Sequence, residues 1–337
     1  MSIPGTQERA ALLETLGTFL GQRKEVAAVS RREWFQPDMA DAQAYAASLP
    51  PYREEWKRLL GWPLTEPAAA AETECELVSQ DAQGRVYRVS QRLFGVVRTY
   101  GLLFLPTAEG RYPLVIAQHG GKGSPELAAG LTEIGSANYN RLVRGLRERG
   151  IAVFAQQLLV WDDGQEPKFD QYLLDRKFRH LGGSRVAFDL CQLQGSFNWL
   201  VEHPEIDADH VGMAGLSYGG FYTLAFTAME PRIRVAVASC FVNDRFRYNW
   251  EDLVWNGSAL RFLDSEIARL VCPRPLFLEA GETDEVFSVE GFFAPSEEVA
   301  HCYAALGIGD RLERRTHPGG HEYDIDGRAE AFLLKWL

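Results

Sequence analysis

Residues 210–221 read HVGMAGLSYGGF, an apolar run that ends in a serine surrounded by small residues. A sequence of this form joins a buried strand to a helix through a very sharp turn, which forces Ser217 into strained backbone geometry. The turn lifts the Ser217 hydroxyl above the sheet, where a base and a substrate reach it. It also directs the Tyr218 N–H toward the position where an oxyanion forms during acyl transfer. The stretch therefore predicts a nucleophilic serine between a strand and a helix.

Runs with strand character recur along the chain and alternate with helical patterns. Strands that are buried on both faces and alternate with helices indicate a mostly parallel sheet, and earlier runs separated by turn residues indicate an antiparallel opening. We therefore predict an α/β fold with a mostly parallel central sheet flanked by helices. The expected strands are 75–80, 86–94, 96–106, 112–118, 151–157, 210–214, 234–240, 275–281 and 310–316, and the expected helices are 138–150, 185–203, 219–229, 296–306 and 327–337.

The beginning of the chain differs from the rest because helix-forming Ala, Leu, Glu and Arg dominate it. We predict an N-terminal helical extension at 1–72 and a catalytic domain at 73–337. Residues 241–262 are expected to form a lid-like insertion in that domain, and the long loop 158–184 a second lid or insertion over the sheet. The extension either covers the site or mediates a homo-oligomer, and the sequence leaves both roles open.

The composition excludes several classes of partner. The net charge is −11, and surfaces that bind nucleic acid or anionic membranes need clustered Lys and Arg, so we expect neither partner. The five cysteines are scattered and form no CxxC pair, which indicates reduced thiols. Glu8, Arg9 and Glu14 interrupt the apolar residues near the N-terminus, unlike a signal peptide. We therefore expect a cytoplasmic protein that acts on a small-molecule substrate.

A serine hydroxyl is a poor nucleophile without a base, so an acid and a histidine should accompany Ser217. In one known arrangement the order along the chain is serine, acid, histidine. Asp284 follows the expected strand 275–281, and His321 lies in a glycine-rich loop before the last helix, so we predict these two partners. His317 is the alternative base, and Glu282, Glu285 and Asp244 are the alternative acids.

The segment HPGGH, which contains His317 and His321, has the HxxxH spacing of a zinc pair. A zinc pair with this spacing needs a helix, and Pro318 with the two following glycines cannot form one. We therefore expect no metal at this site.

A second oxyanion donor is expected after the strand 112–118, where the chain reads QHGGKGSPE. This loop is close to the HGGG-type motif, in which glycines let the backbone approach the substrate carbonyl. We predict the Gly121 N–H as the donor, with the Gly120 N–H as the alternative.

From about residue 75 to the end, the chain resembles the α/β-hydrolase superfamily, and within it the dienelactone-hydrolase-like and acetyl-xylan-esterase-like bacterial esterases. The segments that carry the resemblance are HGGKGSP, NWLVEHPEIDADHVGMAGLSYGGFYTLAFTAMEPRIRVAVASC, CPRPLFLEAGETDEVF and HPGGHEYD. The resemblance implies an α/β-hydrolase fold, with Ser217 as nucleophile, Asp284 as acid, His321 as base, and esterase chemistry without a metal or other cofactor. Dienelactone hydrolases themselves have a cysteine in place of Ser217, so that particular activity is not expected.

Aromatic residues of the insertion bear on which substrate such an enzyme binds. Phe241, Trp250 and Trp255 lie in the insertion 241–262, where they either bind a sugar or aromatic group or pack the insertion onto the body. We expect a carboxylic ester, and a small-acyl carbohydrate ester as the specific case. A serine peptidase, a thioesterase and a non-catalytic binding protein of the same fold remain as alternatives.

Overall fold

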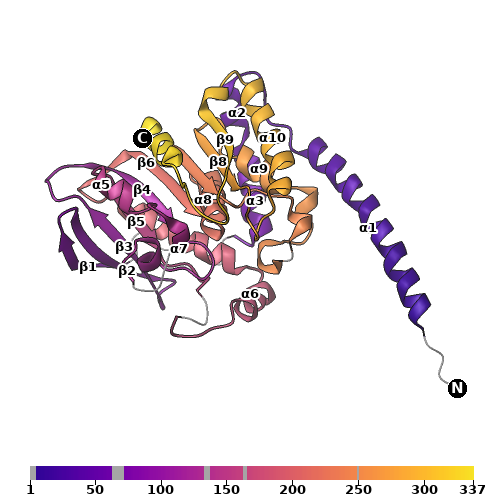
Figure 1. The fold of residues 1–337 in the computed structure, drawn as a ribbon, viewed down its shortest axis with the longest axis horizontal. Coiled ribbons are helices and arrows are strands. Elements are labelled where there is room, and N and C mark those ends of the chain that lie inside the picture. Colours follow the sequence, from indigo (N-terminus) through magenta and orange to yellow (C-terminus); the bar gives the residue numbers. More distant parts are fainter. Residues whose placement is uncertain (1–4, 63–71, 133–136, 162–164, 249) are drawn as a thin grey trace.

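The central feature of the fold is one sheet of nine strands in the order β1-β2-β3-β5-β4-β6-β7-β8-β9 (Figure 1). The computed structural model describes residues 5–62, 72–132, 137–161, 165–248 and 250–337. The pairs β1–β2, β2–β3 and β3–β5 are antiparallel, and the pairs from β5 through β9 are parallel. The predicted antiparallel opening and mostly parallel sheet are therefore confirmed. The strands are β1 Glu72–Asp81, β2 Gly84–Leu93, β3 Val97–Leu105, β4 Tyr112–Gln118, β5 Ala152–Gln156, β6 Ile206–Leu216, β7 Val235–Ser239, β8 Leu276–Gly281 and β9 Leu312–His317.

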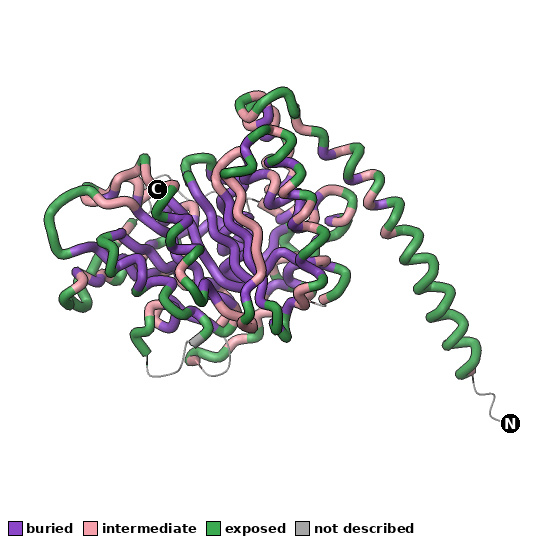
Figure 2. The backbone as a smooth tube through the Cα atoms, turned by 45° about the horizontal axis from the view of Figure 1, so that its top comes forward, coloured by how far each residue is buried: buried purple, intermediate pink, exposed green. Residues whose placement is uncertain are grey.

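Helices cover both faces of the sheet. The larger apolar core lies on the face that α3, α7, α8, α9 and α10 cover, and the smaller core lies under α4, α5 and α11. Figure 2 shows the central strands as a buried layer between them. The α-helices are α1 Thr6–Trp34, α2 Ala42–Ser48, α3 Pro50–Leu60, α4 Pro125–Ala128, α5 Arg144–Glu148, α6 Gln171–His180, α7 Arg185–Leu200, α8 Tyr218–Met229, α9 Asp264–Arg269, α10 Val289–Ala305 and α11 Arg328–Trp336. The 3-10 helices are η1 Ala137–Tyr139, η2 Arg245–Arg247, η3 Glu251–Leu253, η4 Ser258–Leu260 and η5 Gly309–Arg311.

The N-terminal helices relate to the body in two different ways. Helices α2 and α3 pack into the larger core, where the Trp56 ring lies edge-on to Trp255 at 5.3 Å and the Tyr45 hydroxyl donates to the Arg269 carbonyl at 3.0 Å. Helix α1 instead docks only by its C-terminal part, where Ala27 and Arg31 are buried, and its N-terminal part projects away from the body (Figure 1). The predicted boundary between 1–72 and 73–337 adjoins residues 63–71, which lie outside the described part, and the division into these two units stays a prediction. None of the helices in the described ranges has both the length and the apolar character needed to cross a bilayer.

Two sequence-based expectations about elements are wrong in detail. The helix expected at 138–150 is reduced to α5, because Asn140 adopts φ 47° and interrupts a regular helix. The segment 158–184, expected to be a loop, contains α6. The Asp170 carboxylate caps this helix by accepting from the Tyr172 and Leu173 N–H groups at 2.9 Å. The insertion 241–262 consists of η2, η3 and η4 with connecting turns over its described residues.

Candidate active site

Ser217 lies at the junction of β6 and α8 with φ 61° and ψ −123°, which is a strained conformation for a residue with a side chain. Its N–H donates to the Ser239 carbonyl of the neighbouring strand at 2.9 Å, which fixes the turn. A Cβ on Gly219 would lie 2.2 Å from the Gln118 carbonyl oxygen, and a Cβ on Gly215 would lie 2.4 Å from the Gly219 carbonyl carbon. The close approach of these backbones explains why the serine is flanked by glycines.

His321 and Asp284 are hydrogen-bonded to each other beside this turn. The distance from His321 Nδ1 to Asp284 Oδ2 is 2.8 Å, and Asp284 Oδ1 accepts from the backbone N–H groups of Val286 at 2.7 Å and Phe287 at 2.9 Å. Burial raises the pKa of the Asp284 carboxyl, but the hydrogen bond and charge of His321 and these N–H groups outweigh burial, so its pKa lies below the ordinary value. The ionised carboxylate holds the proton on Nδ1 and leaves Nε2 of a neutral imidazole free to accept a proton.

The alternative base is placed elsewhere by the fold. His317 is buried at the end of β9, where its Nδ1 accepts from the Gly319 N–H at 3.2 Å and its Nε2 lies 3.8 Å from Cys240 Sγ. It does not line the cleft that holds Ser217.

The alternative acids are also directed away from His321. Glu282 accepts from the Thr316 hydroxyl at 2.8 Å, and Glu285 is exposed. Asp244 pairs with Lys24 of α1 at 3.2 Å. Of the carboxylates considered from the sequence, the fold brings only Asp284 to His321.

Ser217, Tyr218 and His321 line a cleft of about 610 Å³. Trp250 stacks on the Tyr218 ring with centroids 5.1 Å apart and an angle of 11° between the planes. Another part of the lining comes from Trp161 and Phe169, whose ring centroids are 4.2 Å apart. The cleft therefore combines aromatic walls with the polar groups of the serine and the histidine. Its other lining residues are Gly121, Lys122, Asn138, Val160, Asp170, Gln171, Tyr172 and Val286.

The loop after β4 brings its backbone close to the serine. The Gly120 N–H is occupied, since it donates to the Tyr139 hydroxyl at 2.8 Å. Gly121 lines the cleft, and a Cβ there would lie 3.0 Å from the Tyr218 ring. Over the described residues the Gly121 N–H has no backbone acceptor. This geometry favours Gly121 over Gly120 as the second oxyanion donor, next to the Tyr218 N–H.

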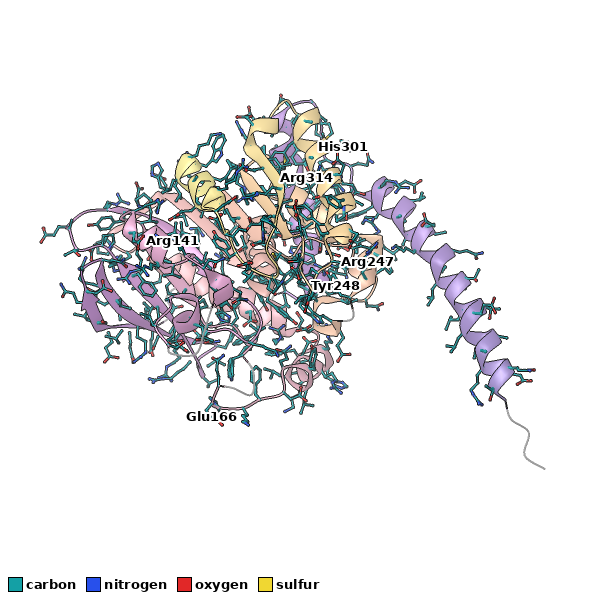
Figure 3. All side chains as sticks on the ribbon, in the orientation of Figure 1. Arg141, Glu166, Arg247, Tyr248, His301 and Arg314 are labelled. Carbon is teal, nitrogen blue, oxygen red and sulfur yellow. The ribbon has the colours of Figure 1, made fainter. Side chains whose placement is uncertain are left out.

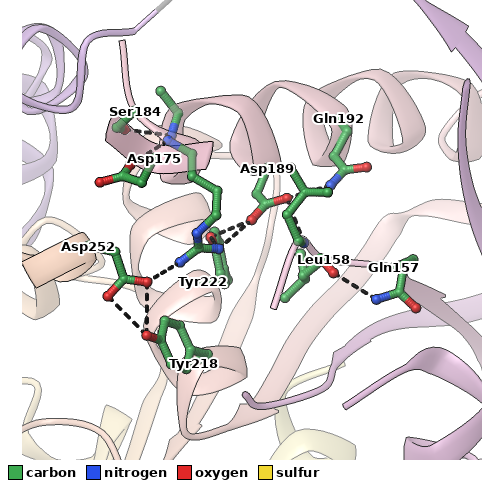
Figure 4. A network of polar contacts seen from close by, with 12 residues as sticks. Gln157, Leu158, Asp175, Ser184, Asp189, Gln192, Tyr218, Tyr222 and Asp252 are labelled. Atoms are coloured by element: carbon green, nitrogen blue, oxygen red, sulfur yellow. Dashed lines mark hydrogen bonds and ion pairs between the residues drawn. The ribbon is translucent and has the colours of Figure 1, made fainter. Parts of the chain in front are cut away.

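A buried ionic network lies behind the cleft and joins it to the insertion (Figure 4). Arg185 of α7 is fully buried and donates to Asp252 of η3 at 2.6 Å and to Asp189 at 3.0 Å. The Tyr218 hydroxyl donates to the same Asp252 carboxylate at 2.9 Å. The Tyr222 hydroxyl donates to Asp189 at 2.6 Å. The network holds the Tyr218 side chain and the segment that carries Trp250 in one place.

The three aromatic residues predicted from the insertion have different positions. Trp250 lines the cleft, as expected of a substrate-binding residue. Phe241 and Trp255 are buried in the core, where both rings contact Phe221, so their expected role in substrate binding is wrong and the packing alternative holds for them.

The sequence analysis missed the contribution of the segment 158–184. This segment supplies Trp161, Phe169 and Tyr172 to the cleft. A signal was present in the sequence, namely several aromatic residues within a segment that is too long for a simple connection.

Three side chains of the triad region, among the described residues, are close enough to hold a metal ion together. They are Cys240, Asp284 and His321, whose ligand atoms lie within 4.8 Å of one another. Burial raises the pKa of the Cys240 thiol to about 12, so this sulfur stays protonated at neutral pH and is a poor metal ligand. The His321 and Asp284 atoms already bond to each other. The donor set fits the triad hydrogen bond better than it fits a metal ion.

Comparisons with known proteins find similar hydrolases. The model of the X-Pro dipeptidyl-peptidase (S15) family matches residues 195–275, which include the Ser217 turn but neither Asp284 nor His321. The "Putative hydrolase YtaP" of Bacillus subtilis is 27% identical over 248 residues, which are 68% of this chain and 80% of that protein.

Solved structures share the fold over most of the chain. A protein described as a "putative acetyl xylan esterase" from Bacteroides fragilis superposes with a TM-score of 0.65 at 16% identity, covering 87% of this chain and 81% of that one. A glucuronoyl esterase from Solibacter usitatus superposes with a TM-score of 0.65 at 15% identity, covering 88% of this chain and 93% of that one. At these identities the likeness shows the fold.

Proposed function

We propose that this chain, a member of the α/β-hydrolase superfamily, is a serine esterase that hydrolyses carboxylic esters through an acyl-enzyme, with Ser217, His321 and Asp284 as its catalytic triad. The observation that carries the proposal is the 2.8 Å hydrogen bond between His321 and Asp284, in a cleft that His321 shares with the strained Ser217. A serine, a histidine and an acid in these positions have the roles of nucleophile, base and orienting group.

The mechanism follows from the proton positions. His321 Nε2 takes the proton of the Ser217 hydroxyl as its oxygen attacks the ester carbonyl, and the Asp284 carboxylate stabilises the imidazolium that forms. The Tyr218 and Gly121 N–H groups donate to the oxyanion of the tetrahedral intermediate. The imidazolium then gives its proton to the leaving alcohol, and an acyl-serine remains. Water attacks this ester with His321 again as base, which releases the acid and restores Ser217.

The walls of the cleft support esters of a ring-shaped alcohol. Flat faces of Trp250 and Trp161 suit stacking against a pyranose or an aromatic ring, and polar side chains at the same cleft suit ring hydroxyls. The fold neighbours described as acetyl xylan and glucuronoyl esterases support a carbohydrate ester. An acylated sugar is the substrate class that we propose.

Peptide hydrolysis is the second candidate, because the X-Pro dipeptidyl-peptidase model matches residues 195–275. The same triad and oxyanion donors cleave amides as well as esters. X-Pro-p-nitroanilide peptides separate the two candidates, since hydrolysis of these peptides faster than of sugar acetates would favour the peptidase.

The first experiment compares wild type and Ser217→Ala on p-nitrophenyl esters from acetate to octanoate, and then on acetylated sugars. We expect the fastest turnover on acetate, and a loss of at least about 10³-fold in kcat for Ser217→Ala with unchanged folding. Ser296→Ala is the matched control, because this buried serine of α10 donates to the carbonyl of Phe292 in its own helix and lies away from the cleft. Equal turnover by Ser217→Ala and wild type would overturn the nucleophile assignment.

A further inference from the structure

Helix α1 leaves a long apolar surface without a partner. Residues 6–23 are exposed at every position and extend away from the body, with side chains standing free around the helix (Figures 2 and 3). At 1.5 Å per residue this projecting part is roughly 27 Å long. It carries large apolar side chains that are each 44% to 69% exposed and that we name the α1 stripe: Leu12, Leu13, Leu16, Phe19 and Leu20.

The α1 stripe continues the face by which α1 docks on its own body. Leu13, Leu16 and Leu20 are followed at steps of three and four by Lys24, Ala27 and Arg31, which places them along one side of the helix. Lys24 pairs with Asp244 at 3.2 Å, Ala27 is buried, and Arg31 donates to the Ala259 carbonyl at 2.7 Å. On the N-terminal side of Lys24 this face of the helix is no longer covered by the body and is exposed.

A glycine at the edge of the stripe leaves room for another backbone to approach closely. Gly17 and Gly21 lie inside the helix, where each costs roughly 1 kcal/mol relative to alanine. A Cβ at either position would meet nothing within 4 Å, so no contact within the described chain explains them. Helices in proteins gain most of their stability from the packing of an apolar face, and residues 6–23 leave theirs exposed while two glycines weaken the helix. A second helix that packs closely on the stripe would account for Gly17, which lies one turn from Leu13 and Leu20; Gly21 lies on the side of α1 nearer to Thr18.

We propose that the α1 stripe is covered by the α1 stripe of a second copy of this chain, with the two helices antiparallel about a two-fold axis. The antiparallel direction of the two helices follows from the position of the rest of each chain relative to its own α1. Each body lies on the stripe side of its own α1 from Lys24 onward. In a parallel pair each body would therefore occupy the space of the other copy's helix and body. In an antiparallel pair the two bodies lie at opposite ends and both stripes are covered.

The antiparallel arrangement also reaches a second exposed apolar residue. Phe246 of η2 is exposed and lies beside Lys24, whose Nζ is 4.4 Å from the centroid of its ring. This is the point where α1 leaves the body, and it is where the N-terminal end of the other copy's α1 arrives. The interface is thus isologous, and each copy contributes its stripe and the rim of its insertion. The proposal does not depend on which substrate the cleft takes.

The test is the molar mass of the full-length protein by light scattering after gel filtration, at tens of micromolar. We expect wild type at twice the chain mass of 37.8 kDa, and Leu16→Glu/Leu20→Glu at 37.8 kDa, because a charge at these positions cannot be buried between two helices. Thr18→Glu is the matched control. It adds one carboxylate, against two in the double variant, on the opposite side of α1, where the Thr18 hydroxyl donates only to the Glu14 carbonyl, so this variant should stay a dimer.

Ester turnover per chain should be unchanged in both variants, since residues 6–23 do not line the cleft. Wild type with the mass of a single chain, or a double-leucine variant with the mass of two, would overturn the proposal. So would a wild-type single chain that sediments with phosphatidylcholine–phosphatidylglycerol vesicles while Leu16→Glu/Leu20→Glu does not, because the occupant would then be a lipid surface.

A cross-linking experiment tests the direction independently. In a Cys75→Ser background, which removes the exposed native thiol, Leu16→Cys near the proposed axis should form an intermolecular disulfide under mild oxidation by glutathione disulfide. Leu13→Cys should cross-link much more slowly, since antiparallel pairing separates the two Leu13 positions along the axis. Equal cross-linking at both positions would contradict the antiparallel arrangement.

Discussion

Each triad side chain is held by contacts that could be seen only once the chain was folded. Asp284 directs one oxygen to His321 and the other to two backbone N–H groups, so its carboxylate cannot turn away without losing three hydrogen bonds. The loop that carries His321 is fixed in turn by Glu279 of β8, which accepts from the Asp324 N–H at 2.9 Å. The position of His321 therefore depends on the buried carboxyl of Glu279, although Glu279 is not a catalytic residue.

Glu279 gives the first prediction, which concerns stability and pH. Burial raises the pKa of its carboxyl from 4.5 to about 7, and its second oxygen has no hydrogen-bond partner over the described residues. Between these values the folded state holds a proton that the unfolded state has lost, so stability falls as pH rises from about 4.5 to 7 and the penalty stays constant above 7. Glu279→Gln keeps the accepting oxygen and removes this penalty.

We expect Glu279→Gln to match wild type near pH 4.5 and to exceed its free energy of unfolding by up to about 3 kcal/mol at pH 8, measured by urea titration. Glu285→Gln serves as the control, because Glu285 is exposed on the neighbouring loop. Parallel pH profiles for Glu279→Gln and wild type would contradict the assignment.

At the scale of elements, the cleft is assembled by segments that have little regular structure of their own. The segment 158–184 and the insertion 241–262 meet over the sheet, and the Arg185 network ties them to α7 and α8. Asp252 is the link on the insertion side, since its carboxylate accepts from both Arg185 and Tyr218.

Asp252→Ala should therefore both destabilise the protein and weaken substrate binding in the cleft. Removal of the carboxylate leaves the buried Arg185 charge with Asp189 alone and the Tyr218 hydroxyl without an acceptor, which costs roughly 3–5 kcal/mol. We expect a lower Tm and a raised KM as Trp250 loses its support, with Asp252→Asn intermediate because it keeps an accepting oxygen. Asp310→Ala in the exposed η5 is the control. An Asp252→Ala variant with the Tm and KM of wild type would refute the role of the network.

Some of these elements could be predicted from the sequence and others could not. The turn at Ser217 and the loops after β8 and β9 could be predicted because their chemistry is encoded in adjacent residues. The helix expected at 138–150 was wrong because Asn140 adopts a left-handed conformation that the apolar pattern does not record. The cleft residues Trp161 and Phe169 were missed since their role depends on contacts with distant segments. Phe241 and Trp255 were misassigned for a related reason, because an aromatic residue in an insertion packs or binds according to neighbours that the sequence does not name.

At the scale of the whole molecule, the N-terminal region is divided between parts that the core needs and a part that it does not. Trp56 and Tyr45 of this region are buried in the larger core. Residues 6–23 are exposed at every position. The region thus combines a piece of the core with a projecting helix.

Two deletions should separate these parts. Removal of residues 1–22 should leave a soluble, folded chain with ester turnover, whereas removal of residues 1–62 should expose the Trp255 side of the core and prevent soluble expression or lower the Tm strongly. The measurement is thermal unfolding followed by circular dichroism. A chain without residues 1–62 that melts at the wild-type temperature would contradict the shared core.

The assignment of Ser217 as the nucleophile is tested by labelling the protein with a fluorophosphonate and identifying the modified residue by mass spectrometry of its peptides. Such a reagent reacts with a serine that a base has activated, and the adduct places a phosphonyl oxygen where the oxyanion forms. We expect one adduct per chain on Ser217, lost in His321→Ala and retained in His317→Ala. Absence of labelling in the folded wild type, or an adduct on another serine, would contradict the assignment of Ser217 as the nucleophile.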